Sequence, residues 1–91
     1  MDEFQRQLQR NQQSAINEFN SKPEFDRVRT IYKNNFDKIA LFISKTNPRS
    51  AIEDIAGLDS NSTQVMFDNM PLFQEINRAI AQKNLTQNDI K

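Results

Sequence analysis

Apolar residues recur along the whole chain with the period of an α-helix. The clearest pattern runs from Phe25 to Ile43, at intervals of three or four residues that align the side chains on one helical face. This face carries Phe25, Val28, Tyr32, Phe36, Ile39 and Ile43. No segment alternates apolar and polar residues for long enough to predict a β-strand. The pattern predicts an all-α fold, a small bundle of four or five helices with the long second helix at its centre.

Prolines and small polar residues mark the expected helix boundaries. Pro23, Pro48 and Pro71 suit the first turn of a helix, where the missing N–H leaves no hydrogen bond unmade. Gly57 and Asn84 are suitable residues for a helix end. The sequence therefore predicts helices at residues 2–20, 23–43, 48–57, 64–69 and 70–84, with at most one further turn at 86–89.

The expected core combines the apolar faces of the second, third and fifth helices. A chain of 91 residues forms one domain and buries roughly 60–65% of its unfolded surface, so these faces must pack on one another. The predicted core residues are Phe25, Val28, Tyr32, Phe36, Ile39, Ile43, Ile52, Ile55, Leu58, Phe73, Ile76 and Ile80.

The first helix has a narrower apolar stripe, and glutamines fill much of its remaining surface. We expect an N-terminal amphipathic, Gln-rich helix at residues 1–20 beside a compact helical domain at 21–91, within a single domain overall. A narrow stripe of this length is marginal as an isolated helix. It must therefore pack either on its own chain or on another molecule, and both alternatives stay open.

The chain has more apolar residues than one small core requires, because some also lie off the main face of the second helix. This excess favours a non-enzymatic protein-interaction module that acts by self-assembly or by docking on a larger protein partner. The predicted partner-binding residues are Phe4, Leu8, Ala15, Phe19, Ile31, Leu41 and Phe42.

The composition removes most catalytic and metal-binding chemistry. The chain has no His and no Cys, and so it lacks the commonest general base, the commonest metal ligand and the thiolate nucleophile. We predict no enzymatic activity, no catalytic residues, no cofactor and no metal. Of 91 residues, 20 are Asn or Gln, and this amide-rich composition in a small chain is typical of phage or mobile-element proteins that act by binding.

Residues 51–70 contain the outlines of two further motifs, and both lack essential residues. Asp59, Asn61 and Thr63 have the spacing of a calcium loop, but Gln64 and Met70 stand where that loop needs Gly and Glu. A helix-turn-helix at 51–67 would place a helix without Lys or Arg against the DNA phosphates. The sequence therefore predicts a helix end, a polar link and a short helix here.

Charge is divided unevenly between the two halves of the chain. Residues 1–49 contain nine basic and six acidic residues, whereas residues 50–91 contain three and six. The alternative function is weak nucleic-acid binding through the basic half, although interleaved acidic residues make nucleic acid an unlikely partner. The residues of this alternative are Arg6, Arg10, Arg27, Arg29, Lys33 and Lys38.

The expected location follows from the absence of two kinds of hydrophobic segment. The first ten residues, MDEFQRQLQR, lack the apolar stretch of a signal peptide. The longest apolar run, residues 39–43, is far shorter than the roughly 20 residues that cross a bilayer. We therefore expect a cytoplasmic protein with no membrane partner.

Overall fold

The computed structural model describes residues 3–45 and 59–91, and these residues are almost entirely helical. No β-strand occurs in either range, and the prediction of a small all-α bundle is confirmed. In chain order the elements are α1 (Glu3–Ser21), η1 (Pro23–Phe25), α2 (Asp26–Asn34), α3 (Phe36–Lys45), α5 (Ser60–Asp68), α6 (Met70–Ala81) and η2 (Gln87–Asp89).

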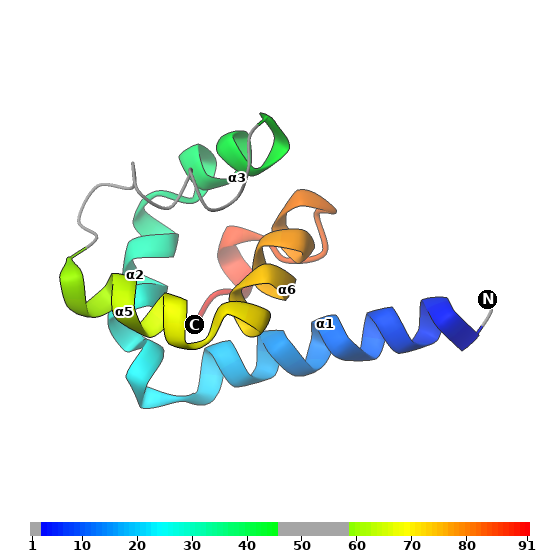
Figure 1. Ribbon diagram of the computed structural model, residues 1–91. Helices are drawn as coiled ribbons and strands as arrows, with labels where there is room; N and C mark the ends of the chain where they lie inside the picture. Colours follow the sequence, from blue (N-terminus) through cyan, green and yellow to red (C-terminus); the bar gives the residue numbers. More distant parts are fainter. Residues whose placement is uncertain (1–2, 46–58) are drawn as a thin grey trace.

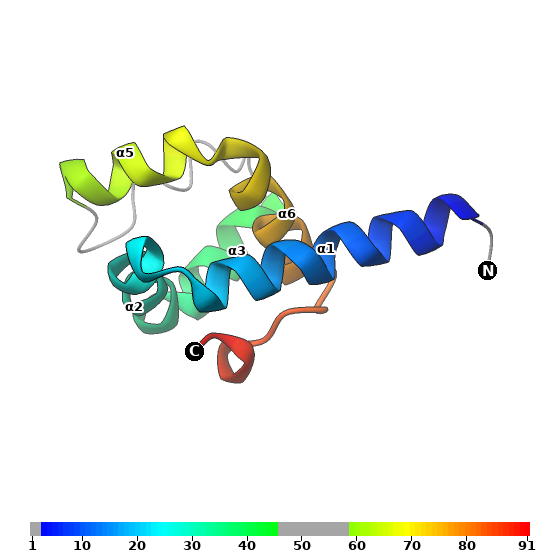
Figure 2. The same cartoon turned by 90° about the horizontal axis from the view of Figure 1, so that it is seen from below.

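Helix α6 holds the other helices together. It packs against α1 along one side and against α3 and α5 elsewhere (Figure 1). After α6 the chain returns past α1, and its last residues lie close to the end of α1 where the chain turns into η1 and α2 (Figure 2). Segments about 70 residues apart in the sequence are therefore neighbours, as in the hydrogen bond from Asn20 Nδ2 to the Asp89 carbonyl, 2.9 Å.

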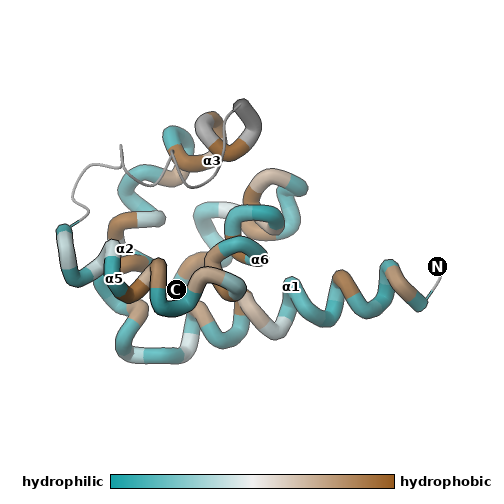
Figure 3. The backbone as a smooth tube through the Cα atoms, viewed as in Figure 1, coloured by the Kyte–Doolittle hydropathy of each residue, from teal (hydrophilic) through white to brown (hydrophobic). Residues whose placement is uncertain are grey.

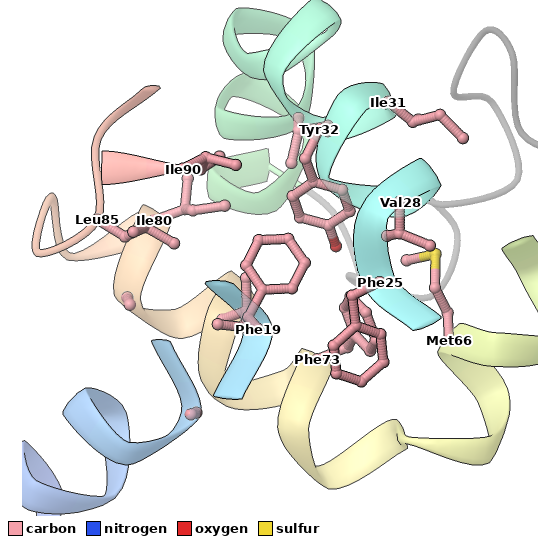
Figure 4. Packing of buried hydrophobic residues seen from close by; sticks show 14 residues of the cluster. Phe19, Phe25, Val28, Ile31, Tyr32, Met66, Phe73, Ile80, Leu85 and Ile90 are labelled. Carbon is pink, nitrogen blue, oxygen red and sulfur yellow. The ribbon is translucent and has the colours of Figure 1, made fainter. Parts of the chain in front are cut away.

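Four aromatic rings meet at the centre of the core (Figure 4). Phe73 of α6 packs edge-to-face on Phe19 of α1, with ring centroids 5.7 Å apart, and on Phe25 of η1, with centroids 5.5 Å apart. Tyr32 of α2 packs on Phe19 at 5.6 Å. Edge-to-face pairs add to the stabilisation from burial alone. The four rings come from four different elements, so their packing joins the two ends of the described chain.

Most of the predicted core is confirmed. Phe25, Val28, Tyr32, Ile39, Phe73, Ile76 and Ile80 are buried, while Phe36 and Ile43 pack at the edge of the core and are partly exposed. The predicted core positions 52, 55 and 58, and the predicted helix at 48–57, lie outside the described residues. The core also contains apolar residues that were not assigned to it from the sequence, namely Ala15, Phe19, Ile31, Met66, Ala79, Leu85 and Ile90.

The predicted second helix is interrupted at Asn35 and forms α2 and α3. Asn35 has backbone angles of φ −120° and ψ 22°, and its side-chain amide donates to the Ile31 carbonyl at 2.9 Å. Asn69, between α5 and α6, repeats this arrangement with φ −121°, ψ 37° and a 2.8 Å bond to the Val65 carbonyl. The Asn35 N–H also bonds the Ile31 carbonyl, at 3.1 Å, whereas the Asn69 N–H bonds the Met66 carbonyl three residues earlier, at 3.3 Å. Each asparagine thus changes the helix direction.

Helix α5 begins four residues earlier than predicted. The Asp59 carboxylate accepts a hydrogen bond from the Ser62 backbone N–H at 2.8 Å and caps the helix. This bond, and a lesser attraction from the Arg27 guanidinium 2.6 Å away, lower the pKa of Asp59. The predicted polar link at residues 60–63 is therefore the first turn of a helix, and Asp59 has a structural role.

The C-terminal residues are anchored by two buried side chains, Leu85 and Ile90. Between them, the hydroxyl and backbone N–H of Thr86 both bond the Asp89 carboxylate, at 3.0 and 2.9 Å, and form a capping box for η2. Residues 86–89 thus form the further turn that the sequence allowed; the turn itself is exposed, and the buried Leu85 and Ile90 on either side of it belong to the core.

Tyr32 and Asn77 form a hydrogen bond inside the core. The phenolic hydroxyl donates to Asn77 Oδ1 at 2.8 Å, and Asn77 is itself buried. Burial raises the pKa of Tyr32 well above its usual value, and the bond to Asn77 offsets only part of this effect. The hydroxyl therefore stays protonated in the folded protein and serves the packing of α2 on α6.

We expect alkaline unfolding to be driven in part by Tyr32. The unfolded chain ionises its phenol near pH 10, whereas the folded chain keeps the proton, so unfolding releases a proton above that pH. Stability should be unaffected by this group below pH 10 and fall above it by up to about 1.4 kcal/mol per pH unit. Tyr32 is the only tyrosine, and phenolate absorbance should therefore rise together with the loss of helical circular dichroism. Phenolate formation near pH 10 in a chain that is still folded would contradict this expectation.

Candidate protein-binding site

The N-terminal part of α1 projects beyond the rest of the protein (Figures 1 and 2). Helix α1 has 19 residues and is about 28 Å long, whereas α6, on which it packs, has 12 residues and covers about 18 Å. Burial follows this difference in length. Residues 3–11 include no buried side chain, and Gln12 is the first buried residue of the helix. We call residues 3–11 the arm.

The arm exposes a large apolar side chain. Phe4 is 72% exposed, and Leu8, one helical turn further on and on the same face, is half-buried. The hydropathy-coloured tube is mainly hydrophilic along this part of α1, with separate hydrophobic positions in it (Figure 3). Arg6 and Arg10 lie on the opposite face, because they are about half a helical turn away from Phe4 and Leu8. The arm is thus amphipathic without a protein layer over its apolar face.

Exposed polar contacts support the helical form of the arm. Arg10 pairs with Glu3 at 3.1 Å, and the Gln7 amide donates to Asn11 Oδ1 at 3.1 Å. Contacts of this kind on a helix surface contribute little individually, and a short helix without packing is marginal in water. Packing another molecule on Phe4 and Leu8 would therefore stabilise the helix as well as bury the apolar face.

A cavity of about 430 Å³ lies where the arm meets the C-terminal end of α6. We call this cavity the notch. Leu8 supplies apolar surface on the arm side, and Arg78 lies on the α6 side. The full lining is Gln5, Leu8, Gln9, Gln12, Arg78, Gln82 and Asn84. Its volume is in the range of pockets that hold ligand groups or side chains.

Three amides hold the two sides of the notch together. The Gln12 amide donates to Gln82 Oε1 at 2.8 Å, and the Asn84 amide donates to Gln12 Oε1 at 3.0 Å. Gln12 is buried, so these bonds satisfy polar groups that have lost contact with water. They fix the direction in which the arm leaves the body of the protein.

The end of α6 places Gln82 and Asn84 beside α1. The Asn84 N–H bonds the Ala79 carbonyl at 2.8 Å, and the Lys83 N–H bonds the Ile80 carbonyl at 3.0 Å, as in a Schellman helix end. Lys83 adopts the left-handed conformation, with φ 63°, that this ending requires and that usually favours glycine. This unfavourable backbone conformation occurs where the chain turns from α6 towards α1.

A second hollow, of about 610 Å³, adjoins the notch and shares Gln9, Gln12 and Asn84 with it. Arg6, Arg10 and the amides of α1 line it, and Arg10 also makes the pair with Glu3. Its lining comprises Arg6, Gln9, Arg10, Gln12, Gln13, Ile16 and Asn84. Ile16 is its one apolar lining residue, as Leu8 is that of the notch, so polar side chains line most of both hollows.

Three of the predicted partner-binding residues belong to the chain's own core, and this prediction is corrected. Ala15, Phe19 and Ile31 are buried by α6, η1 and the other core elements. Phe4 and Leu8 lie on the arm. Leu41, on α3, is 53% exposed, and the side chain of Phe42 lies outside the description. The C-terminal half of α1 therefore packs within its own chain, and only its N-terminal half presents an apolar surface.

The six basic residues of the nucleic-acid alternative do not form one surface. Arg6 and Arg10 lie on the arm, at the opposite end of the molecule from α2 (Figure 2). Lys33 and Lys38 are exposed on α2 and α3. Arg27 pairs with Asp59 at 2.6 Å.

The assignment of Arg29 to a nucleic-acid surface is corrected, because its side chain is buried. Its guanidinium donates to the Phe19 carbonyl, to the Lys22 carbonyl at 3.0 Å and to the Asp26 carboxylate. The two carbonyls lie at the C-terminal end of α1, where helical bonding leaves carbonyl groups without partners and the dipole favours a cation. Arg29 therefore joins α1 to α2.

Comparison with known proteins adds no relative: no family model, no curated protein and no solved structure matches the chain. Within residues 3–45 and 59–91, no helix is long and apolar enough to cross a membrane, and acidic side chains do not gather in groups of three that could hold a metal ion.

The notch residues on α6 and after it were not found from the sequence. They resemble solvated surface residues, and only their contact with α1 distinguishes them.

Proposed function

We propose that this protein is a small, non-enzymatic interaction module that self-assembles through the arm. The observation that supports this most strongly is the exposure of Phe4, 72%, on a helix that extends beyond its own core. Large apolar side chains on a projecting element favour contact with another protein, because burying them removes apolar surface from water.

The face and form of the arm support a helix-mediated contact. Phe4 and Leu8 are spaced by four residues, which is the spacing of anchor residues on a helix that lies in a groove. The arm is already helical, so binding does not have to order it from a coil and loses less conformational entropy. The two buried apolar residues of the first-helix stripe, Ala15 and Phe19, hold the base of the arm on the body of the protein.

Self-assembly is preferred to docking on a larger protein because one chain carries both an exposed anchor and a cavity of suitable size. Phe4 is the anchor, and the cavity is the notch, which Leu8 and six polar side chains line. A surface that contains both elements can pair with a copy of itself.

We expect the full chain to form a concentration-dependent dimer and Phe4→Asp to abolish it. A charge at position 4 would have to be buried without a partner in the dimer, whereas Phe4 is exposed in the monomer and its replacement should leave the fold intact. Sedimentation equilibrium measures the association state, and circular dichroism checks the helical content.

Gln13→Asp is the matched control. It adds the same charge to the same helix, on an exposed position of the opposite face, and should leave the dimer unchanged. A wild-type chain that stays monomeric at about 1 mM, where even a weak complex would be half-formed, would refute self-assembly. An equal loss of dimer in both variants would show that charge, and not the apolar face, is responsible.

A further inference from the structure

The notch and the second hollow together form a concave surface between the arm and the chain that follows α6. We call this surface, with the lining residues of both hollows, the corner. Its basic side chains are Arg6, Arg10 and Arg78, and most of its other side chains are Gln or Asn amides. None of the described residues that line it is acidic. The corner is therefore positively charged, although the formal net charge of the whole chain is zero.

The amides of the corner form a chain of hydrogen bonds that ends in an unused donor. The Asn84 amide donates to Gln12 Oε1 at 3.0 Å, and the Gln12 amide donates to Gln82 Oε1 at 2.8 Å. The Gln82 amide nitrogen, at the end of this chain, donates to none of the described residues. Arg78 lies one helical turn before Gln82, and both residues line the notch. Neighbouring N–H donors are thus available there to an anionic group.

The three arginines have donors left for a further anion. Arg6 makes no ion pair with the described residues. Arg10 pairs with Glu3 through Nη2 at 3.1 Å, and Arg78 pairs with Glu75 through Nη1 at 2.6 Å. These two arginine side chains are 63% and 47% exposed. Because a guanidinium has five N–H donors, each can bind a second carboxylate while it keeps its present pair.

We propose that the corner binds an acidic peptide segment of a partner protein. The carboxylates of the segment bind the arginines, since the guanidinium fork matches a carboxylate in a bidentate pair. Its backbone groups bind the amides, because a Gln or Asn side chain donates and accepts as a peptide group does. This proposal goes beyond self-assembly, since it uses the polar side chains of the corner and does not use Phe4.

The positions of the arginines predict how the segment lies. Arg78 lines the notch, whereas Arg6 and Arg10 line the second hollow. Gln9 lines both hollows, and its side chain makes no hydrogen bond with the described residues. A segment that crosses the arm at Gln9 therefore brings one carboxylate to Arg78 and another to Arg6 and Arg10.

The number of charges favours a peptide over a nucleic acid. Affinity for nucleic acid comes mainly from the number of phosphates that basic side chains neutralise. Three arginines are few for this purpose, and Glu3 and Glu75 beside two of them repel a continuous line of phosphates. Two or three carboxylates, with neutral peptide groups between them, match the corner better.

Binding of hexaglutamate with blocked ends to the full chain tests the proposal. We expect a saturable change in the NMR signals of the Gln9 and Gln82 side-chain amides and of the arginine Nε–H groups. The change should be present at about 0.1 M salt and largely lost at about 1 M, where the screening length falls from about 10 Å to about 3 Å. Hexaglutamine is the uncharged control and should leave these signals unchanged.

Single substitutions assign the binding to the corner. Arg78→Gln and Arg6→Gln should each weaken hexaglutamate binding about three- to tenfold, while circular dichroism shows an unchanged helical content. Lys38→Gln is the matched control, because it removes the same charge from an exposed position on α3 and should leave the affinity unchanged.

Three outcomes would overturn the proposal. They are the absence of a saturable change with hexaglutamate at about 0.1 M salt, an equal loss of affinity in Lys38→Gln, and tighter binding of an oligothymidylate of the same charge. The last result would identify the corner as a nucleic-acid surface. The measurement does not depend on association of the chain, so a monomer that binds hexaglutamate would refute self-assembly and leave this proposal intact.

Discussion

Replacing Phe19 by alanine is expected to cost about 3–5 kcal/mol of unfolding free energy. Phe19 is fully buried and contacts three other aromatic rings, with centroids 6.2 Å from Phe25, 5.6 Å from Tyr32 and 5.7 Å from Phe73. The replacement leaves a cavity between four elements that come from distant parts of the chain, and these elements cannot all move in to fill it. Because small domains have only about 5–15 kcal/mol of stability in total, we expect much of the population to unfold at moderate temperature.

Phe4→Ala is the matched control for this experiment. It removes the same atoms from the same helix, but at a position that is 72% exposed, and should change the stability of the monomer by no more than about 0.5 kcal/mol. Urea unfolding at low protein concentration, followed by circular dichroism, measures both values. Similar losses in the two variants would mean that the arm is packed in solution and that the exposed face is absent.

The second large effect is expected for Arg29→Met. Methionine keeps much of the apolar stem but removes the guanidinium that bonds the Phe19 and Lys22 carbonyls and the Asp26 carboxylate. Carbonyl groups at the end of α1 then lose their partners in a buried setting. We expect a loss of about 2–4 kcal/mol, since hydrogen bonds to charged groups contribute about 1.5–3 kcal/mol each and the orphaned groups are partly resolvated.

Arg27→Met, two residues earlier, is the control for Arg29→Met. The Arg27 side chain is 64% exposed, and its pair with Asp59 lies at the surface, where such pairs contribute at most about 1 kcal/mol. The difference between the unfolding free energies of the two variants measures how much of the stabilisation by Arg29 depends on its burial. If both variants unfold at the same urea concentration, Arg29 does not join α1 to α2 in solution.

The local pattern of the sequence was sufficient for most of the helical segments in residues 3–45 and 59–91 and for most of the core. A helical period places Phe25, Val28 and Tyr32 on one face of the helix, independently of which element packs against it. The apolar face is wide enough that it must be buried. The same argument correctly identified Phe73, Ile76 and Ile80 in α6. These features depend on neighbours three or four residues away, which the sequence displays directly.

Periodicity could not distinguish the two halves of the first helix. Phe4 and Phe19 occupy the same stripe, and no residue between them marks where the neighbouring helix stops. The exposure of Phe4 and the burial of Phe19 depend on the length and position of α6, whose last helical residue is Ala81. The interruption at Asn35 was missed because the apolar period continues through it: Asn35 has the angles φ −120° and ψ 22°, although its N–H and its side-chain amide both bond the Ile31 carbonyl.

The sequence by itself determined an all-α fold, the apolar faces that make its core, and the absence of His and Cys chemistry, because these depend on residue types and on short-range spacing. The tertiary structure alone decided which part of the apolar stripe faces outwards, that Arg29 is buried while Arg27 is exposed, and that Gln12 meets Gln82 and Asn84 to form the notch. Those outcomes require contacts between residues up to 72 positions apart. Such contacts depend on how whole helices pack on one another, and the spacing of nearby residues in the sequence does not predict them.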